Sequence, residues 1–482
     1  MILIEGTLSF FISTTLFIYA MTYFLVFTAN INKHMGYYVI KPLLLMIGIT
    51  LFLLNTYCLY KYKSRLAIQI IAGTNFNEIR EFVMMYFSWT LAICFLLLVL
   101  VISITTYIFI TKINIRVFKL RWIPMSIILF ISLLLVGFNK NSIPQLYHVG
   151  GLSDIANYYY TPTYPRIESE TDVCPAYIVT IIGESFAPSH SSIYGYEKET
   201  NPLLKRKLED KELVIFDKVT SPEVTTTATF VYLLNTYKVG MEHECVWYKC
   251  TNLIEVLKVA GYHTSWVSNQ EETGIFNNIS SDHSKICDES AFMTEDAEGN
   301  KYDEALIKWK PSNPNKRQAV FYHLMGQHFL YQERYPSQYD IFKPTDYQSK
   351  KWKGETLASY DNATLYNDYV VSSIIDKYKD SDAIVFYLSD HGEDIYDTNP
   401  NYCGHAINTP ESQAVGKKIP FMVYLSPIYQ QLRPDLTARI KNTINKEFCT
   451  DKLIYAVMGA AGLKFADNDD VRKFSLFSET YR

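Results

Sequence analysis

Four apolar stretches near the start of the chain most constrain how it can fold. They occupy residues 6–31, 42–60, 84–110 and 122–138. A helix needs about 20 apolar residues to cross a bilayer, so each stretch is long enough to span. The first stretch lacks the basic start of a signal peptide and exceeds the usual length of its apolar core. The sequence therefore predicts an α-helical membrane domain of about four helices at residues 1–140.

A basic loop between the third and fourth stretches predicts the orientation of this domain. The loop carries Lys112, Arg116, Lys119 and Arg121. Short loops rich in Lys and Arg stay in the cytoplasm, so the fourth stretch should lead to the opposite side. We expect residues 141–170, which are polar, aromatic and proline-containing, to form a linker at the membrane surface. Residues 171–482 should then form an exported domain.

The composition of the exported part agrees with this location. It contains six cysteines, an even number, which in an oxidising compartment favours disulfides over a thiolate metal site without CxxC spacing: Cys174, Cys245, Cys250, Cys287, Cys403 and Cys449. Only Cys245 and Cys250 are close in sequence. The net charge of −4 argues against nucleic acid as a partner.

The exported part alternates between buried strand patterns and helix patterns. Short apolar, β-branched runs at residues 176–185, 317–328, 382–394 and 418–426 are typical of strands buried on both faces. Residues 250–263 and 362–380 have helical periodicity. This alternation predicts an α/β sheet with helices on both faces, that is, an α/β/α sandwich.

Polar residues follow three of the predicted strands. Glu184 follows the first, His328 ends the second, and Asp390 and His391 follow the third. Ligands of open α/β sheets bind at the carboxyl ends of the strands. Each residue alone is more often a helix cap or a solvated loop residue. Together, Glu, Asp and His suit a zinc or manganese ion with mixed oxygen and nitrogen ligands, which leaves a fourth ligand to be found.

The segment SPEVTTTATF at residues 221–230 offers candidates for that ligand. A threonine hydroxyl must be activated before it can act as a nucleophile. A cation can do this, and it also offsets negative charge on a phosphoryl group. One threonine could then serve as both ligand and attacking group. The alternative interpretation is a polar loop without a chemical role.

Four further segments stand out in the exported part: IIGESFAPSHSSIYGYEKETNPLL, YLSDHGED, MGQHFLYQERYP and CGHAINTPESQAVGKKIPFMVYLS. Together they resemble the signature segments of a known family, the lipid A and lipooligosaccharide phosphoethanolamine transferases. These are membrane-anchored members of the alkaline phosphatase and sulfatase superfamily. The resemblance covers nearly the whole chain and implies an alkaline phosphatase/sulfatase-like catalytic domain. Two features depart from the family: Pro222 replaces a cysteine found in many members, and well-known members have five spans.

The resemblance also implies roles for individual residues. The metal ligands fall on Glu184, Asp390, His391 and a threonine, which is also the nucleophile. Counting four residues beyond Pro222 selects Thr226, which is the predicted nucleophile and ligand, whereas aligning on the Thr-Ala pair would select Thr227 as the alternative. The implied cofactor is Zn²⁺, one ion or two, with Mn²⁺ fitting less well. Residues that line the phosphate side, hold a second zinc or contact the donor head group are His328, His405, Asn269 and Gln270.

The implied reaction moves phosphoethanolamine from phosphatidylethanolamine to a lipid A or other lipopolysaccharide acceptor through a threonine intermediate. The implied location is the bacterial inner membrane, with the catalytic domain in the periplasm. Two alternatives remain: a phosphoglycerol transferase of the same superfamily and a non-catalytic lipid-binding membrane protein. Sulfatase activity is disfavoured, because the sequence lacks the C/S-x-P-x-R pattern required for formylglycine.

Overall fold

The computed structural model describes residues 162–169, 174–241, 244–272, 279–293, 302–400, 402–405 and 409–481. All of them belong to one of two compact units of the chain. The four predicted spans and the basic loop lie outside the described residues. Among the residues that are described, no helix is both long and apolar enough to cross a membrane.

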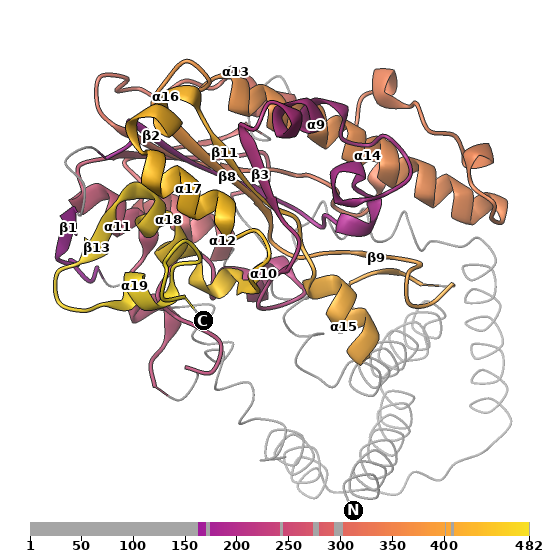
Figure 1. The fold of residues 1–482 in the computed structure, drawn as a ribbon. Coiled ribbons are helices and arrows are strands. Elements are labelled where there is room, and N and C mark those ends of the chain that lie inside the picture. Colours follow the sequence, from indigo (N-terminus) through magenta and orange to yellow (C-terminus); the bar gives the residue numbers. More distant parts are fainter. Residues whose placement is uncertain are drawn as a thin grey trace, which may run out of the picture. The chain divides into compact units, whose positions relative to one another are not determined.

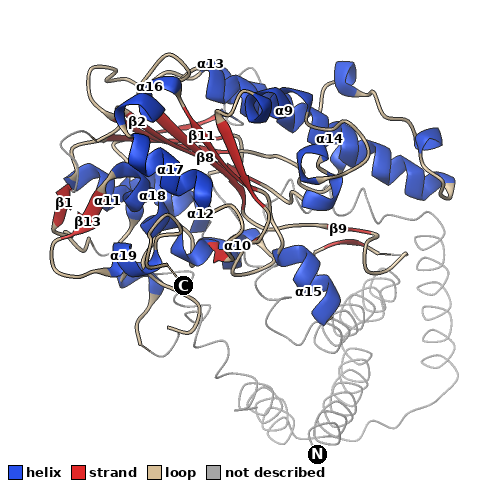
Figure 2. Cartoon of the chain, viewed as in Figure 1, coloured by secondary structure: helices blue, strands red, loops and turns tan. Residues whose placement is uncertain are grey.

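A seven-stranded mixed sheet forms the centre of the domain (Figures 1 and 2). Its strands lie in the order β3-β11-β8-β2-β7-β5-β6. Neighbouring strands from β8 to β6 are parallel, while β11 is antiparallel to both β8 and β3. The strands are β2 (Tyr177–Gly183), β3 (Leu213–Phe216), β5 (His263–Ser268), β6 (Glu289–Phe292), β7 (Gln318–His323), β8 (Ala383–Ser389) and β11 (Phe421–Leu425).

Side chains alternate between the two faces of the sheet, as strand geometry requires. Val179 of β2 and Val385 of β8 are register partners, and both pack into a cluster with buried residues of α14. Phe386, the next residue of β8, packs instead against Phe421 and Phe477, with ring centroids 6.5 Å away in each case. The central strands are therefore buried on both faces, as their continuous apolar runs predict.

Helices cover both faces of the sheet. Figure 1 shows α9 and α14 along one side and α17 and α18 along the other, which confirms the predicted sandwich. The helices are α9 (Pro202–Glu209), α10 (Thr226–Phe230), α11 (Leu253–Val259), α12 (Ile279–Asp282), α13 (Glu304–Lys308), α14 (Lys351–Asp376), α15 (Pro410–Lys417), α16 (Pro427–Leu432), α17 (Pro434–Asn442), α18 (Leu453–Ala461) and α19 (Asp470–Phe474).

Three two-stranded sheets complete the part of the chain that the structure describes. β1 (Ile167–Ser169) pairs with β13 (Leu463–Phe465), β4 (Val219–Thr220) with β12 (Phe448–Cys449), and β9 (Asp394–Ile395) with β10 (Cys403–Gly404). The first of these pairs brings residues 167–169, which the sequence assigned to the linker, into the folded domain.

The structure differs from the sequence predictions in three places. β11 is antiparallel, so the start of residues 418–426, and not their end, lies at the edge where β2 and β8 end. The predicted helix at residues 250–263 is shorter, because α11 ends at Val259 and β5 begins at His263. The helix predicted at 362–380 begins earlier, since α14 starts at Lys351.

Candidate metal and phosphoryl-transfer site

Glu184 follows β2 at a sharp turn of the backbone. Ser185 has a φ of 54°, a left-handed conformation that non-glycine residues rarely adopt outside constrained sites. The backbone N–H groups of Ser185 and Phe186 hold the turn by donating to Asp390 Oδ1 at 3.3 Å and Ser389 Oγ at 2.9 Å. Glu184 itself is 1% exposed. Two neighbouring strand ends therefore fix this carboxylate in the interior.

Asp390 and His391 follow β8, directly beside that turn. The imidazole of His391 donates from Nδ1 to the Gly392 carbonyl at 2.9 Å. This orients Nε2 toward Glu184 Oε1 at 3.1 Å and Asp390 Oδ2 at 3.6 Å. Gly392 has no space for a side chain, because a Cβ would lie 2.4 Å from the Lys418 carbonyl oxygen. The glycine thus lets the backbone after the Asp-His pair pack closely against the backbone of residues 415–418.

Thr226 brings a hydroxyl to the same point. It is the first residue of α10 and follows Thr225, which is extended with φ −138° and ψ 148°. Thr226 Oγ1 donates to Glu184 Oε2 at 3.0 Å and lies 3.4 Å from His391 Nε2. No hydrogen bond within the described residues joins Thr227 to these groups. Of the two threonines that the sequence left open, Thr226 is the one that meets the cluster.

A second group of potential ligands shares His391. Glu393 Oε2 lies 2.6 Å from His405 Nδ1, and Tyr331 donates its hydroxyl to Glu393 Oε1 at 2.8 Å. The rings of His391 and His405 have centroids 4.2 Å apart. Ligand atoms of His391, Glu393 and His405 all lie within 4.8 Å of one another, as do those of Glu184, Asp390 and His391.

His328 reaches this region from the loop after β7. Burial lowers the pKa of its imidazole to about 3, while the charge of Glu184 opposes that shift and those of Arg334, His405 and His391 add to it. His328 is thus close enough to both groups of ligands to be influenced by their charge, and it is kept neutral near pH 7.

The charges of the buried group favour a cation. Burial raises the pKa of Asp390 to about 8, and the charge of Glu184 adds to this effect. Burial would also raise the pKa of Glu184, but the charge and hydrogen bond of His391 hold it well below its ordinary value. Two buried carboxylates therefore compete for one imidazole. Asp390 Oδ2 is buried and accepts no hydrogen bond from the described residues, so a metal ion fits these residues.

The structure gives Asn269 and Gln270, the predicted head-group contacts, different surroundings. Asn269 is fully buried, and its amide donates to Asp303 Oδ1 at 2.9 Å. Gln270 donates from Nε2 to Glu184 Oε2 at 3.3 Å and to the Leu324 carbonyl at 2.9 Å. A contact of either residue with a donor lipid stays a prediction.

Sequence reasoning missed three residues that support the site. Glu393 lies within the quoted DHGED segment, and its place two residues after His391 could have drawn attention to it. Ser185, which donates to Glu184 Oε1 at 2.7 Å, is adjacent to a predicted ligand. Asp303 precedes a short helix and carries no local signal, because its partners are distant in sequence.

The cysteines do not form the predicted disulfides. All six cysteines among the described residues are free thiols in the structure. Cys245 and Cys250, the pair suggested by sequence spacing, do have neighbouring sulfur atoms, 3.1 Å apart. A disulfide has a sulfur–sulfur distance of about 2.05 Å, so these two thiols are in contact without being bonded.

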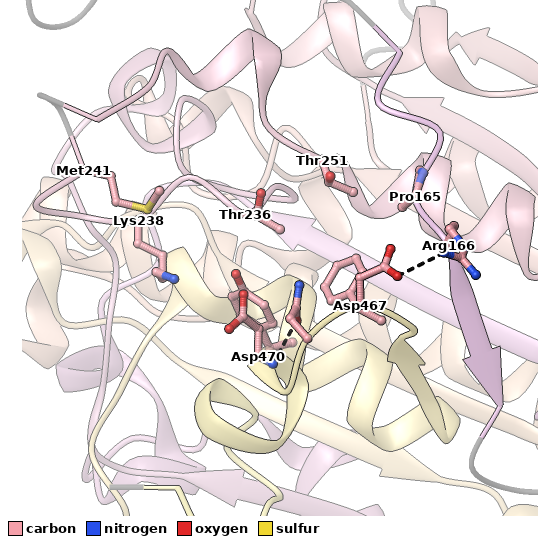
Figure 3. Close-up of a pocket in the computed structure, with 11 residues that line it drawn as sticks. Pro165, Arg166, Thr236, Lys238, Met241, Thr251, Asp467 and Asp470 are labelled. Carbon is pink, nitrogen blue, oxygen red and sulfur yellow. Dashed lines mark hydrogen bonds and ion pairs between the residues drawn. The ribbon is translucent and has the colours of Figure 1, made fainter.

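A cavity of about 290 Å³ lies apart from the candidate ligands. Figure 3 shows Arg166 and Asp467 at its rim, joined by an ion pair of 3.2 Å. Lys238 also lines it, with Nζ 3.8 Å from the centroid of the Phe474 ring. None of the predicted metal ligands lines this cavity.

Comparison with known proteins identifies the family to which the chain belongs. Residues 176–463 match the Sulfatase family over more than half of the chain. The chain belongs to this family. The superfamily inferred from the sequence motifs is therefore confirmed.

Several curated relatives of the chain are named phosphoethanolamine transferases. EptC of Escherichia coli K12 is 28% identical over 336 residues, which are 67% of this chain and 57% of that protein. The Kdo(2)-lipid A phosphoethanolamine 7''-transferase of the same organism is 29% identical over 271 residues, 54% of this chain and 46% of that protein. The chain thus spans about half the length of these relatives.

Solved structures show the same fold. The C-terminal periplasmic domain of E. coli EptC in complex with zinc matches with a TM-score of 0.59 and 26% identity, over 67% of this chain and 92% of that one. The integral membrane protein EptA of Neisseria meningitidis matches with a TM-score of 0.63 and 19% identity, over 94% of this chain and 87% of that one. The latter likeness concerns the fold alone.

Proposed function

We propose that this protein is a zinc-dependent phosphoethanolamine transferase of the bacterial inner membrane, with its catalytic domain in the periplasm. It takes phosphoethanolamine from phosphatidylethanolamine and passes it to lipid A or another lipopolysaccharide acceptor. The observation that carries the proposal is the meeting of the Thr226 hydroxyl with Glu184 and His391 in a buried, acidic cluster. The names of the relatives support the identity of the transferred group.

Zinc suits the proposed ligands. Glu184, Asp390, His391 and Thr226 supply oxygen and nitrogen donors, which zinc accepts in four-coordinate sites. When bound, zinc would lower the pKa of the threonine hydroxyl and offset negative charge on the phosphoryl oxygens. The zinc complex of the EptC domain is consistent with this choice.

The threonine carries the phosphoethanolamine between donor and acceptor. Thr226 Oγ1 forms a bond to phosphorus and loses its proton, while the bond from phosphorus to the diacylglycerol oxygen breaks and that oxygen gains a proton. An acceptor oxygen then loses its proton and bonds to phosphorus, and Thr226 regains its hydroxyl. His328 and His405 line the phosphate side, and the contact of His405 Nδ1 with Glu393 orients its ring for proton transfer.

Membrane anchoring would assist this reaction. Donor and acceptor are both bilayer lipids, so tethering the domain raises its effective concentration toward each of them. The predicted spans at residues 1–140 would provide the tether. Adding an ethanolamine amine reduces the negative charge of the outer surface, and we expect this to weaken the binding of cationic antimicrobial peptides such as polymyxin.

Lipid turnover tests the proposal. Full-length protein with zinc should release diacylglycerol from labelled phosphatidylethanolamine and transfer the label to added lipid A. Removal of zinc by a chelator should stop the release of diacylglycerol, and adding zinc back should restore that release. Release from phosphatidylglycerol alone would favour the phosphoglycerol transferase, and release from neither lipid would overturn the enzymatic function.

A further inference from the structure

Among the described residues, four polar groups contact the carboxylate of Glu184, and they divide into two kinds. Thr226 Oγ1 and His391 Nε2 lie 3.0 Å and 3.1 Å from it and are themselves proposed metal ligands. Ser185 Oγ, at 2.7 Å from Oε1, and Gln270 Nε2, at 3.3 Å from Oε2, are not. The second pair can keep its hydrogen bonds while the other groups bind a cation.

Gln270 is held firmly at the end of β5. Its Nε2 donates to the Leu324 carbonyl at 2.9 Å as well as to Glu184. Its backbone N–H donates to Ser268 Oγ at 3.0 Å, and that hydroxyl lies 3.3 Å from the Gln270 carbonyl. The side-chain amide is therefore fixed between the loop after β7 and the carboxylate of Glu184.

A buried aspartate ties the same two segments together. Asp303, which is 5% exposed, accepts hydrogen bonds of 2.9 Å from Asn269 Nδ2 and from the backbone N–H groups of Met325 and Gly326. Three donors satisfy a carboxylate that would otherwise be costly to bury. Asp303 thus fixes Asn269, next to Gln270, relative to the loop that leads to His328.

That loop also rests on the backbone of Glu184. The Gln327 N–H donates to the Glu184 carbonyl at 3.0 Å. A Cβ on Gly326 would lie 2.8 Å from the Glu184 nitrogen, so only glycine permits this close approach. The side chain and the backbone of Glu184 are therefore held by two segments that Asp303 joins.

We propose that Gln270 is a positioning residue that presents Glu184 to the cation, and that Asp303 and Asn269 keep Gln270 in place. This inference rests on the proposed function, since it requires a metal at Glu184. A neutral amide is well suited to the role, because it donates to the carboxylate without adding charge. A lysine in its place would compete with the cation, and an acid would repel Glu184. Outer groups that orient a metal ligand typically contribute 10–100-fold to metal affinity.

Substitution by methionine tests this role with little change in shape. Gln270→Met keeps an unbranched side chain of similar length but removes the donor. In the full-length protein, we expect zinc affinity, measured by competition with a chelator, to fall roughly 10–100-fold. kcat at saturating zinc should fall while KM for phosphatidylethanolamine stays unchanged. A raised KM with unaltered zinc affinity would instead make Gln270 a head-group contact and overturn the inference.

Gln318→Met is a matched control. Gln318 is fully buried, whereas Gln270 is partly buried. The Nε2 of Gln318 likewise donates two hydrogen bonds, to the backbone carbonyls of Asn313 and Lys316, but Gln318 lies at the start of β7. The Gln318→Met variant should differ from the unaltered protein in thermal stability but not in zinc affinity. Equal zinc affinities in both methionine variants would overturn the inference.

Asp303→Asn provides a second variant that does not alter Gln270. It should lower zinc affinity in the same direction but less, because only the anchoring of Gln270 is weakened. Unaltered zinc affinity in this variant would contradict the role given to Asp303. If the unaltered protein bound no zinc, both the proposed metal dependence and this inference would be overturned. If zinc bound equally well to the unaltered protein and to Gln270→Met, the role of Gln270 would be overturned while the proposed function would stand.

Discussion

The two ligand groups that share His391 differ in charge and in exposure. In the first group, Glu184 and Asp390 are fully buried and face one imidazole. In the second, Glu393 is already paired with His405, whose side chain is 22% exposed, and with Tyr331. The first group thus holds two buried carboxylates for one imidazole, and a bound cation would let both carboxylates ionise. In the second group the single carboxylate has two partners, and His405 is partly exposed. This difference suggests a permanently held ion in the first and contact with the moving phosphoryl group in the second.

The largest effect should come from removing the hydroxyl that serves the first group. Thr226→Ala removes the proposed nucleophile, so we expect turnover to fall by roughly 10⁴-fold or more. Zinc should still bind, because Glu184, Asp390 and His391 remain. Thr227→Ala is the control and should retain most activity. The opposite ranking of these two variants would transfer the nucleophilic role to Thr227.

The next largest effect should be a difference in zinc affinity between variants of the first group and variants of the second. Asp390→Asn removes a ligand from the first group, so zinc affinity should fall by more than the roughly 100-fold that loss of an outer partner causes. Glu393→Gln, in the second group, should leave this affinity within about 10-fold and reduce turnover by roughly 100-fold, because His405 loses its orienting carboxylate. Chelator competition and turnover assays on both variants measure the contrast. Equal zinc losses would remove the distinction between the groups.

The stability contributed by His283, which lies outside the two groups, should respond to pH in the opposite sense to that of His391. Burial lowers the pKa of His283 to about 4, below its value of about 6.5 in an unfolded chain. Its contribution to stability is therefore complete above pH 6.5 and is lost as the pH falls toward 4. The loss is on the order of 3 kcal/mol. For metal-free protein, denaturant unfolding at pH 7 and pH 4.5 should show a smaller difference in His283→Phe than in the unaltered chain.

His391 provides the contrast within the metal-free site. Burial would lower its pKa, but Asp390 and Glu184 raise it to about 10. Its contribution to stability is therefore present below pH 6.5 and lost as the pH rises through about 10. A metal-free protein whose stability was the same at pH 7 and pH 10.5 would argue against this ion pair.

The smallest effect is expected at the cavity of Figure 3. Arg166 and Asp467 form an ion pair whose side chains are 77% and 62% exposed, and exposed pairs contribute little to stability. Arg166→Ala should therefore leave both melting temperature and phosphoethanolamine transfer nearly unchanged. A marked loss of transfer would show that this cavity, and not only the strand ends, takes part in the reaction.

The strand ends could be predicted because their signals are local. Glu184 and the Asp390-His391 pair each follow a short, β-branched apolar run that is typical of a buried strand, and the carboxyl ends of parallel strands meet at one edge of a sheet. The antiparallel direction of β11 could not be predicted in this way, since its apolar run has no direction. The boundary between α11 and β5 was missed because only a three-residue turn separates them.

The contacts of the candidate site required the folded chain. Thr226 and Thr227 are neighbouring residues of the same type, so the sequence alone does not distinguish them. The start of α10 at Thr226 directs that hydroxyl to Glu184. Gln270 resembled a head-group contact because of its neighbours in sequence, whereas its amide lies on Glu184 and Leu324. Asp303 had no signal at all, because its partners are separated from it by 22 to 34 residues. Long-range hydrogen bonds of this kind leave no pattern in a single sequence.

Mass spectrometry of the peptide that contains the threonines tests the central claim most directly. Trypsin should release residues 219–238 as one peptide. After incubation of the full-length protein with phosphatidylethanolamine and zinc, without acceptor, we expect this peptide to carry phosphoethanolamine on Thr226, and lipid A should then remove it. Diacylglycerol release with the peptide unmodified, or with the group on another residue, would contradict the account.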